Sequence, residues 1–187
     1  MKTPLDQNAI ILSMADCFTR DEKAIYCSSE LTTGIRLYTA CLDNKLTDRY
    51  ALADKLGKEW LRDNVFKVNE TEANRFADEV QRKRQHTTIS PAALFVPEWG
   101  QHDYLGFWDK LIRTRIREVH FNENWQYSNG CTFEYSAARY AGLPTYDKNG
   151  LPLTPAEASK MIRQAIDLLT TKGIDTRKLE EHRNQIG

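Results

Sequence analysis

Residues 23–34, KAIYCSSELTTG, are the stretch from which the fold of this chain is best inferred. An apolar run at 23–29 predicts a short buried strand. The small polar residues at 28–34 predict a loop that leads into a helix, and Ser, Thr and Gly suit close approach of the backbone to a ligand. We therefore expect a strand that delivers a polar loop to the start of a helix.

The same alternation continues along the chain. It predicts an α/β three-layer sandwich with a short, mostly parallel sheet of four to five strands, Rossmann-like or flavodoxin-like. Further strands are expected at 92–96 (AALFV, ended by Pro97), 118–121 and 144–146, and helices at 47–63, 71–84, 105–115 and 130–141, the last closed by Gly142.

Both ends of the chain add helices to this core, and we expect one domain over residues 1–187. An amphipathic helix is expected at 5–19, within an N-terminal segment 1–20, ahead of a nucleotide-binding core at 23–147. The C-terminal segment, 152–187, holds a helix that starts at Thr154-Pro155-Ala156-Glu157, a capping box. Its polar last residues predict a loose terminal helix.

Composition excludes several classes of protein. Lys and Arg number 26 and Asp and Glu number 26, so binding to a nucleic-acid strand is not favoured. No apolar stretch approaches the length that spans a bilayer, and residues 1–20 do not resemble a secretion signal, so we expect a cytoplasmic protein. The four cysteines form no CxxC pair and no zinc-ligand spacing. We expect reduced thiols, no metal and no cofactor.

Three loops rich in polar and aromatic residues follow the first three predicted strands. They are 28–34, 97–104 (PEWGQHDY) and 122–130 (NENWQYSNG). Because ligands bind at the carboxyl ends of the strands in parallel sheets, we expect these loops to share one site.

The most informative local feature is the segment 125–138, WQYSNGCTFEYSAA. Ser128 and Gly130 stand just before a predicted helix, and Glu134 lies about one turn inside it. The backbone amides at a helix start, together with a Ser hydroxyl, form an anion site. Gly130 would let a phosphate approach the backbone. The segment therefore predicts a carboxylate close to a bound anion.

The spacing Ser-x-Gly-x-x-x-Glu, with Gly-Leu-Pro eight residues past Glu134, resembles the nucleoside 2-deoxyribosyltransferase-like superfamily. The strand at 25–29 and the order of elements over 23–147 extend the resemblance. It implies that Glu134 attacks the anomeric carbon of a ribose or deoxyribose and expels the base. It also implies that Ser128 and Gly130, with the amides of Asn129 and Cys131, hold a 5′-phosphate or the sugar 5′ end. By the same resemblance, Ser28 and the loop after it, including Ser29, form the wall near the sugar or base.

The chain departs from the family at the loop before the catalytic helix. Deoxyribosyltransferases commonly carry aspartates there, whereas this chain has Asn122, Glu123 and Asn124. Asp103 is a possible substitute, and Asp103 or His102 is the candidate proton donor for the departing base. The rings available to line the site or stack on a base are Trp99, Tyr104, Trp125 and Tyr127.

Plainer interpretations exist for each of these residues. Glu134 could be a solvated helix residue, Ser128 or Asn129 only a helix cap, and His102 a surface histidine. The tryptophans could belong to the core or to a subunit interface.

Three functions remain open on this sequence. The first is a hydrolase or transferase acting on the N-glycosidic bond of a nucleotide or nucleoside through a carboxylate nucleophile. The second is a non-catalytic nucleotide-binding or sensing module on the same fold. The third is an NAD glycohydrolase. The expected partner is one small nucleotide or nucleoside, in a homo-oligomer, because relatives often complete the site across a dimer.

Overall fold

A computed structural model describes residues 23–186 of the chain. The helix expected at 5–19 and Cys17 lie outside the described residues. None of the helices within 23–186 is long and apolar enough to cross a membrane.

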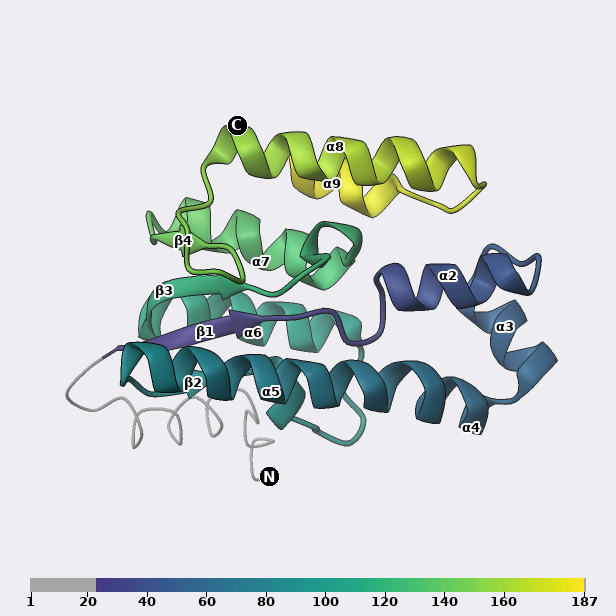
Figure 1. The fold of residues 1–187 in the computed structure, drawn as a ribbon, viewed down its shortest axis with the longest axis horizontal. Helices are drawn as coiled ribbons and strands as arrows, with labels where there is room; N and C mark the ends of the chain where they lie inside the picture. The colour runs from purple at the N-terminus through teal and green to yellow at the C-terminus, as the bar shows by residue number, and fades with distance from the viewer. Residues whose placement is uncertain (1–22, 187) are drawn as a thin grey trace, which may run out of the picture.

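The centre of the fold is a parallel sheet of four strands in the order β2-β1-β3-β4 (Figure 1). All five residues of β1 are buried, as the sequence predicted for the first strand. The α/β class and the Rossmann-like parallel arrangement are confirmed. The strands are β1 (Ala24–Ser28), β2 (Thr88–Ile89), β3 (Ile116–Phe121) and β4 (Thr145–Tyr146).

Helices cover both faces of this sheet (Figure 1). Alternate residues of β1 point to opposite faces. Ile25 and Cys27 pack with three residues of α5, whereas the Tyr26 ring lies 5.6 Å from that of Trp108 on α6. The helices preceding the C-terminal segment are α2 (Ile35–Asp43), α3 (Arg49–Leu56), α4 (Lys58–Leu61), α5 (Lys67–Arg84), α6 (Gln101–Arg115) and α7 (Asn129–Tyr140).

Two helices close the chain, α8 (Pro155–Thr171) and α9 (Arg177–Asn184). The predicted capping box is present, because Thr154 and Glu157 exchange hydrogen bonds at the start of α8. The terminal helix is held against α7, since the Ser136 hydroxyl donates to the His182 carbonyl at 3.1 Å. A terminal helix is present, as predicted, but it is packed against α7 and is not loose.

The strand expected at 92–96 is absent, and the second strand is Thr88–Ile89. Ser90 caps a short 3-10 turn at Pro91–Ala93, so the chain leaves the sheet before the apolar run begins. Phe95, in the middle of that run, is 83% exposed. A short apolar run without alternation is therefore not sufficient to predict a buried strand.

The helices between β1 and β2 also differ from expectation. The single helix predicted at 47–63 ends at Gly57, whose φ of 93° interrupts the helical backbone. A π-helical turn at Arg62–Phe66 then joins α4 to α5. The helix expected at 71–84 consequently begins earlier, at Lys67.

Candidate functional site

A buried carboxyl group lies at the carboxyl end of β1, where the side chains of Tyr26, Ser28 and Glu134 meet. Glu134 is on α7 and only 4% exposed. Its Oε1 accepts a hydrogen bond from the Tyr26 hydroxyl at 2.8 Å, and its Oε2 accepts one from Ser28 Oγ at 2.6 Å. Tyr26 and Ser28 point to the same face because they are two residues apart on a strand. The structure thus brings Glu134 and Ser28 together.

Burial controls the ionisation of this group. Removal from water raises the pKa of Glu134 to about 7, while the hydrogen bonds from Ser28 and Tyr26 pull it down. The pKa of Tyr26 is raised well above its ordinary value, first by burial and then by the neighbouring carboxylate. Tyr26 is therefore a permanent donor, and Glu134 populates both of its forms near neutral pH.

The start of α7 is occupied by a side chain from the loop after β1. Ser128 Oγ accepts the Cys131 amide at 3.4 Å, which confirms the capping geometry. The Asn129 amide donates to Thr33 Oγ1 at 3.2 Å, and that hydroxyl lies 3.3 Å from Ser128 Oγ. A Cβ at Gly130 would lie 3.8 Å from Ser128 Oγ, an ordinary contact, so the present packing does not require glycine there.

The C-terminal helix α9 supports the same turn from the other side. Thr132 Oγ1 lies 3.0 Å from the Ser128 carbonyl and 3.0 Å from His182 Nδ1. Burial lowers the pKa of His182, which favours the neutral ring. Sequence reasoning missed Tyr26, Thr33 and His182. Only Tyr26 carried a usable signal, its two-residue spacing from Ser28.

Three of the four predicted rings pack among other aromatic rings. Trp125 is 2% exposed and stacks on Tyr135 with ring centres 5.2 Å apart, which makes it a core residue. Trp99 packs against Tyr104 at 5.1 Å. The Tyr104 hydroxyl accepts the amide of Val96.

The other two predicted contacts of the ligand also lie at or near the core. Tyr127 is half-buried and packs on the core. Ser29 is buried, and its hydroxyl has no hydrogen-bond partner within residues 23–186.

The two candidate proton donors lie on the first turn of α6, not in a loop as expected for 97–104. The Asp103 carboxylate accepts the Gly100 amide at 2.8 Å and so caps its own helix. His102 is exposed. No hydrogen bond among residues 23–186 links either side chain to Glu134, Ser28 or Ser128. Their assignment as proton donors stays a prediction.

A cleft of about 550 Å³ lies between α2, α5 and the loop after β3. We call it the α2–α5 cleft. Glu134, Ser28 and Ser128 do not line it. Its lining residues are Glu30, Ile35, Arg36, Thr39, Ala40, Asp43, Asn44, Trp60, Asn69, Glu72, Arg75, Asn122, Glu123 and Asn124.

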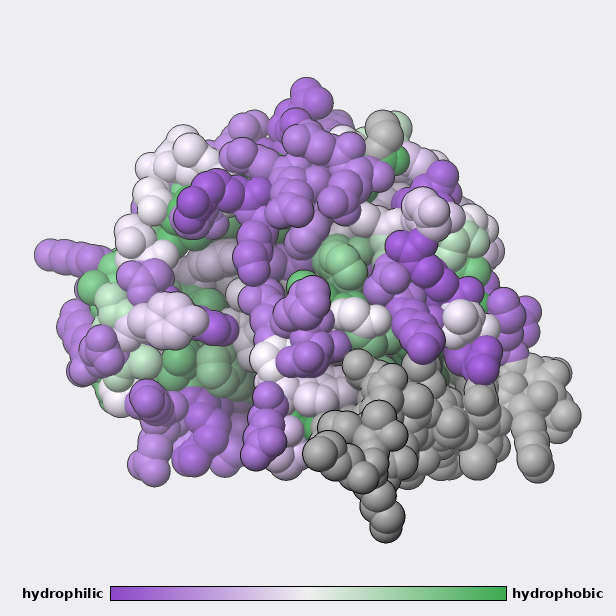
Figure 2. All heavy atoms as spheres, turned by 180° about the vertical axis from the view of Figure 1, so that it is seen from behind, coloured by the Kyte–Doolittle hydropathy of each residue, from purple (hydrophilic) through white to green (hydrophobic). Residues whose placement is uncertain are grey.

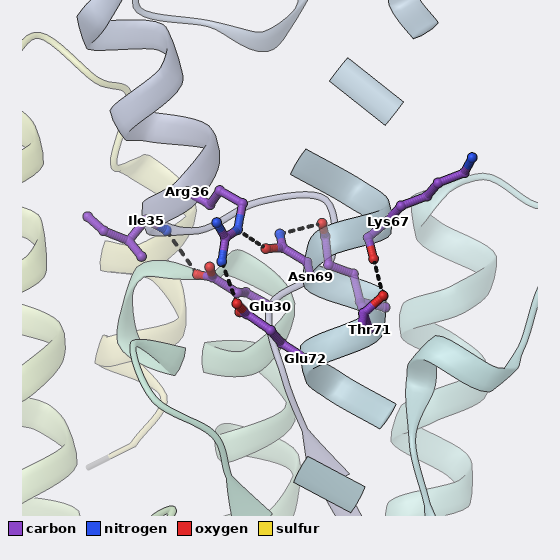
Figure 3. A network of polar contacts seen from close by, with 8 residues as sticks. Glu30, Ile35, Arg36, Lys67, Asn69, Thr71 and Glu72 are labelled. Carbon is purple, nitrogen blue, oxygen red and sulfur yellow. Dashed lines mark hydrogen bonds and ion pairs between the residues drawn. The ribbon is translucent and has the colours of Figure 1, made fainter. Parts of the chain in front are cut away.

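A polar network fixes one wall of the cleft (Figure 3). Arg36 donates from Nε to Asn69 Oδ1 at 2.9 Å and from Nη2 to Glu72 Oε1 at 2.7 Å. The amide of Asn69, which is 1% exposed, donates to the Leu31 carbonyl at 2.9 Å. These bonds connect the loop after β1 with α2 and α5. The Arg36 guanidinium is therefore already hydrogen-bonded within the protein.

Glu30 is the carboxyl group that this loop delivers to the cleft. Its Oε2 accepts the Ile35 amide at 2.9 Å. A Cβ at Gly34, whose φ is 137°, would lie 1.9 Å from that oxygen, so only glycine leaves room for the carboxyl group. Burial raises the pKa of Glu30 to about 7, although two backbone amides and Arg36 oppose the shift. Glu30 was not among the residues predicted for the site.

Comparison of the chain with protein-family models, with curated proteins and with solved structures gives no match. Among residues 23–186, no group of three or more His, Cys, Asp or Glu could hold a metal ion. The fold is that of a Rossmann-like α/β protein, with two buried carboxyl groups, Glu134 and Glu30, near the carboxyl end of β1.

Proposed function

We propose that the protein is an enzyme that acts on the N-glycosidic bond of a nucleoside or nucleotide, with Glu134 as the nucleophile. The supporting observation is the buried Glu134 carboxyl, held from two sides by Tyr26 and Ser28 at the carboxyl ends of the strands. Ligands bind at this edge of parallel sheets. The Ser-x-Gly-x-x-x-Glu spacing and its resemblance to deoxyribosyltransferases support the same reaction.

The chemistry needs an ionised carboxylate that is held in one orientation. One Glu134 oxygen bonds to the anomeric carbon while the bond from that carbon to the base nitrogen breaks, and the base leaves with the electron pair and takes up a proton. Water or a second base then displaces Glu134 from the sugar. The donors Tyr26 and Ser28 hold the carboxylate in one orientation during the reaction.

Substrate must displace part of the loop after β1, because Glu134 is buried. The contact to release is that of Thr33 with the start of α7. A phosphate oxygen or a sugar 5′ oxygen takes the place of Thr33 Oγ1 at the Asn129 amide. The anion site predicted from Ser128 and Gly130 is then filled by the ligand instead of by the protein.

A second candidate function is a nucleotide-binding module without turnover. The observation that favours it is the closure of the site, since Glu134 is only 4% exposed and both of its oxygens are satisfied within the protein. A ligand that remains in the α2–α5 cleft needs no access to Glu134.

Incubation with a panel of ribo- and deoxyribonucleosides, their 5′-monophosphates and NAD tests the proposal, with free base measured by chromatography. An enzyme releases base from at least one member. Binding of a member without release of base supports the module. Release of nicotinamide from NAD alone identifies the NAD glycohydrolase.

A further inference from the structure

We propose that the α2–α5 cleft binds the base and selects a heterocycle with two adjacent N–H donors, as guanine presents, by accepting both at the Glu30 carboxylate. The inference rests on the proposed function for the identity of the ligand as a nucleoside. It rests on the cleft for the choice of base.

The first step is the charge and hydrogen-bonding character of the lining. Four of the lining side chains are carboxyl groups and two are guanidinium groups. One guanidinium, that of Arg36, is engaged by Asn69 and Glu72. Acceptors therefore predominate, and the like charge of the carboxylates disfavours a phosphate in this cleft. The carboxyl side chains are those of Glu30, Asp43, Glu72 and Glu123.

The second step is shape. Among the described residues, Trp60 is the one aromatic residue of the lining, and an indole stacks well on a planar heterocycle. The cleft volume of about 550 Å³ is within the range of sites for small organic ligands. Figure 2 shows the face opposite to that of Figure 1, where hydrophilic side chains predominate among the described residues.

The third step is the geometry of Glu30. The Ile35 amide and the space above Gly34 fix this carboxyl group on the cleft wall (Figure 3). Each carboxylate oxygen has two lone pairs, so the Glu30 carboxylate can accept two ligand N–H groups in addition to the Ile35 and Arg36 amides. An ionised carboxylate offers two acceptors side by side. It matches the ring N–H and amino group of guanine, whereas hypoxanthine supplies only one of those donors.

The ionisation of Glu30 then controls binding. Its pKa of about 7 leaves the free protein partly protonated at neutral pH, and a guanine edge favours the ionised form. Affinity for guanosine should rise about tenfold from pH 6 to pH 8. The titratable and charged groups around Glu30 are Arg36 and Tyr38 on α2, Glu72 on α5, Cys131 on α7, and Asp43, Arg75 and Glu123 in the cleft lining.

The test is calorimetric titration with guanosine, inosine and adenosine, carried out on Glu134→Gln protein so that no base is released. Guanosine should bind at least tenfold more tightly than inosine. Adding Glu30→Gln replaces one acceptor by an N–H₂ donor, and should abolish both this preference and its pH dependence. The Gln carbonyl can still accept the Ile35 amide, so the cap of α2 is kept, and thermal unfolding checks the fold. Glu70→Gln, an exposed site on α5 outside the cleft, is the matched control.

Equal affinity for guanosine and inosine, no binding of any of the three, or a preference that survives Glu30→Gln would overturn the inference. The base-release assay on the unmodified protein separates this outcome from that of the proposed function. Selective binding without release of base would contradict the enzyme proposal and leave the cleft proposal standing. Release of base, without a preference for guanosine that depends on Glu30, would contradict the cleft proposal and leave the enzyme proposal standing.

Discussion

Glu134 and Glu30 are two carboxyl groups at the same edge of the sheet, and burial raises the pKa of each to about 7. Their partners differ. Glu134 is enclosed by two side-chain hydroxyls inside the core, whereas Glu30 is held by two backbone amides and lines an open cleft. The comparison shows that a raised pKa does not define a role. The partners and the access decide whether a carboxyl suits bond formation or recognition.

The largest expected effect is the loss of base release in Glu134→Gln. The amide cannot form the bond to the anomeric carbon, so the rate should fall by about 10³-fold or more. Chromatography of the released base measures it. Glu70→Gln should keep the unmodified rate. Glu134→Gln with an unchanged rate would remove Glu134 from the reaction.

The second prediction concerns the pH dependence of stability. The folded-state pKa of Glu134 lies above its ordinary value of 4.5, so between about pH 4.5 and pH 7 the folded state binds more protons than the unfolded state. The contribution of Glu134 to the free energy of unfolding therefore falls by about 3 kcal/mol as pH rises through this window. Glu30 adds in the same direction.

Urea unfolding at a series of pH values measures this slope. It should be smaller in Glu134→Gln and smaller again in the double variant with Glu30→Gln. Equal slopes between pH 5 and pH 7 in the unmodified protein and in the double variant would contradict raised pKa values at these carboxyl groups.

Tyr26→Phe perturbs the site around Glu134 without changing the α2–α5 cleft. It leaves Glu134 Oε1 buried without its donor, and should lower the free energy of unfolding by about 1–3 kcal/mol. Binding in the cleft should not change. Tyr140→Phe, at an 81% exposed ring, is the control and should change stability by less than about 0.5 kcal/mol. Equal effects of the two substitutions would show that the Tyr26 contact is of little importance.

The smallest effect is expected at Thr33. Thr33→Val removes the hydroxyl that occupies the Asn129 amide, so a nucleoside 5′-monophosphate should bind about fivefold more tightly, while the matching nucleoside is affected less. Calorimetry on both ligands measures the difference. Weaker binding of the monophosphate would indicate that Thr33 contacts the ligand instead of competing with it.

Much of the enclosed region could be predicted from the sequence, because it depends on local rules. The apolar run 23–29 and the Ser128 cap indicated a strand end facing a helix start, which places Ser28 near Glu134. The open region could not be predicted in this way. The cleft is lined by α2, α5 and the loops after β1 and β3, which are distant in sequence. The Glu30 carboxyl group occupies the space that a Cβ at residue 34 would fill, and Gly34 leaves that space open.

The errors have a common cause in local competition. Ser90 and Pro91 ended the second strand before the apolar run, and Gly57 broke a helix whose apolar spacing was continuous. Asp103, which was expected in a loop, lies on the first turn of α6 and caps that helix. In each case a short-range hydrogen bond or a backbone angle determined the local structure, whereas the sequence pattern had predicted a different structure.

The central claim, that Glu134 bonds to the sugar, is tested most directly by trapping that bond. Protein mixed with its substrate is quenched in acid before the ester hydrolyses, digested, and analysed by mass spectrometry. The account predicts a sugar without base attached to Glu134, in the peptide from α7, and its absence in Glu134→Gln. Attachment to any other residue, or a released sugar of inverted anomeric configuration, would contradict it.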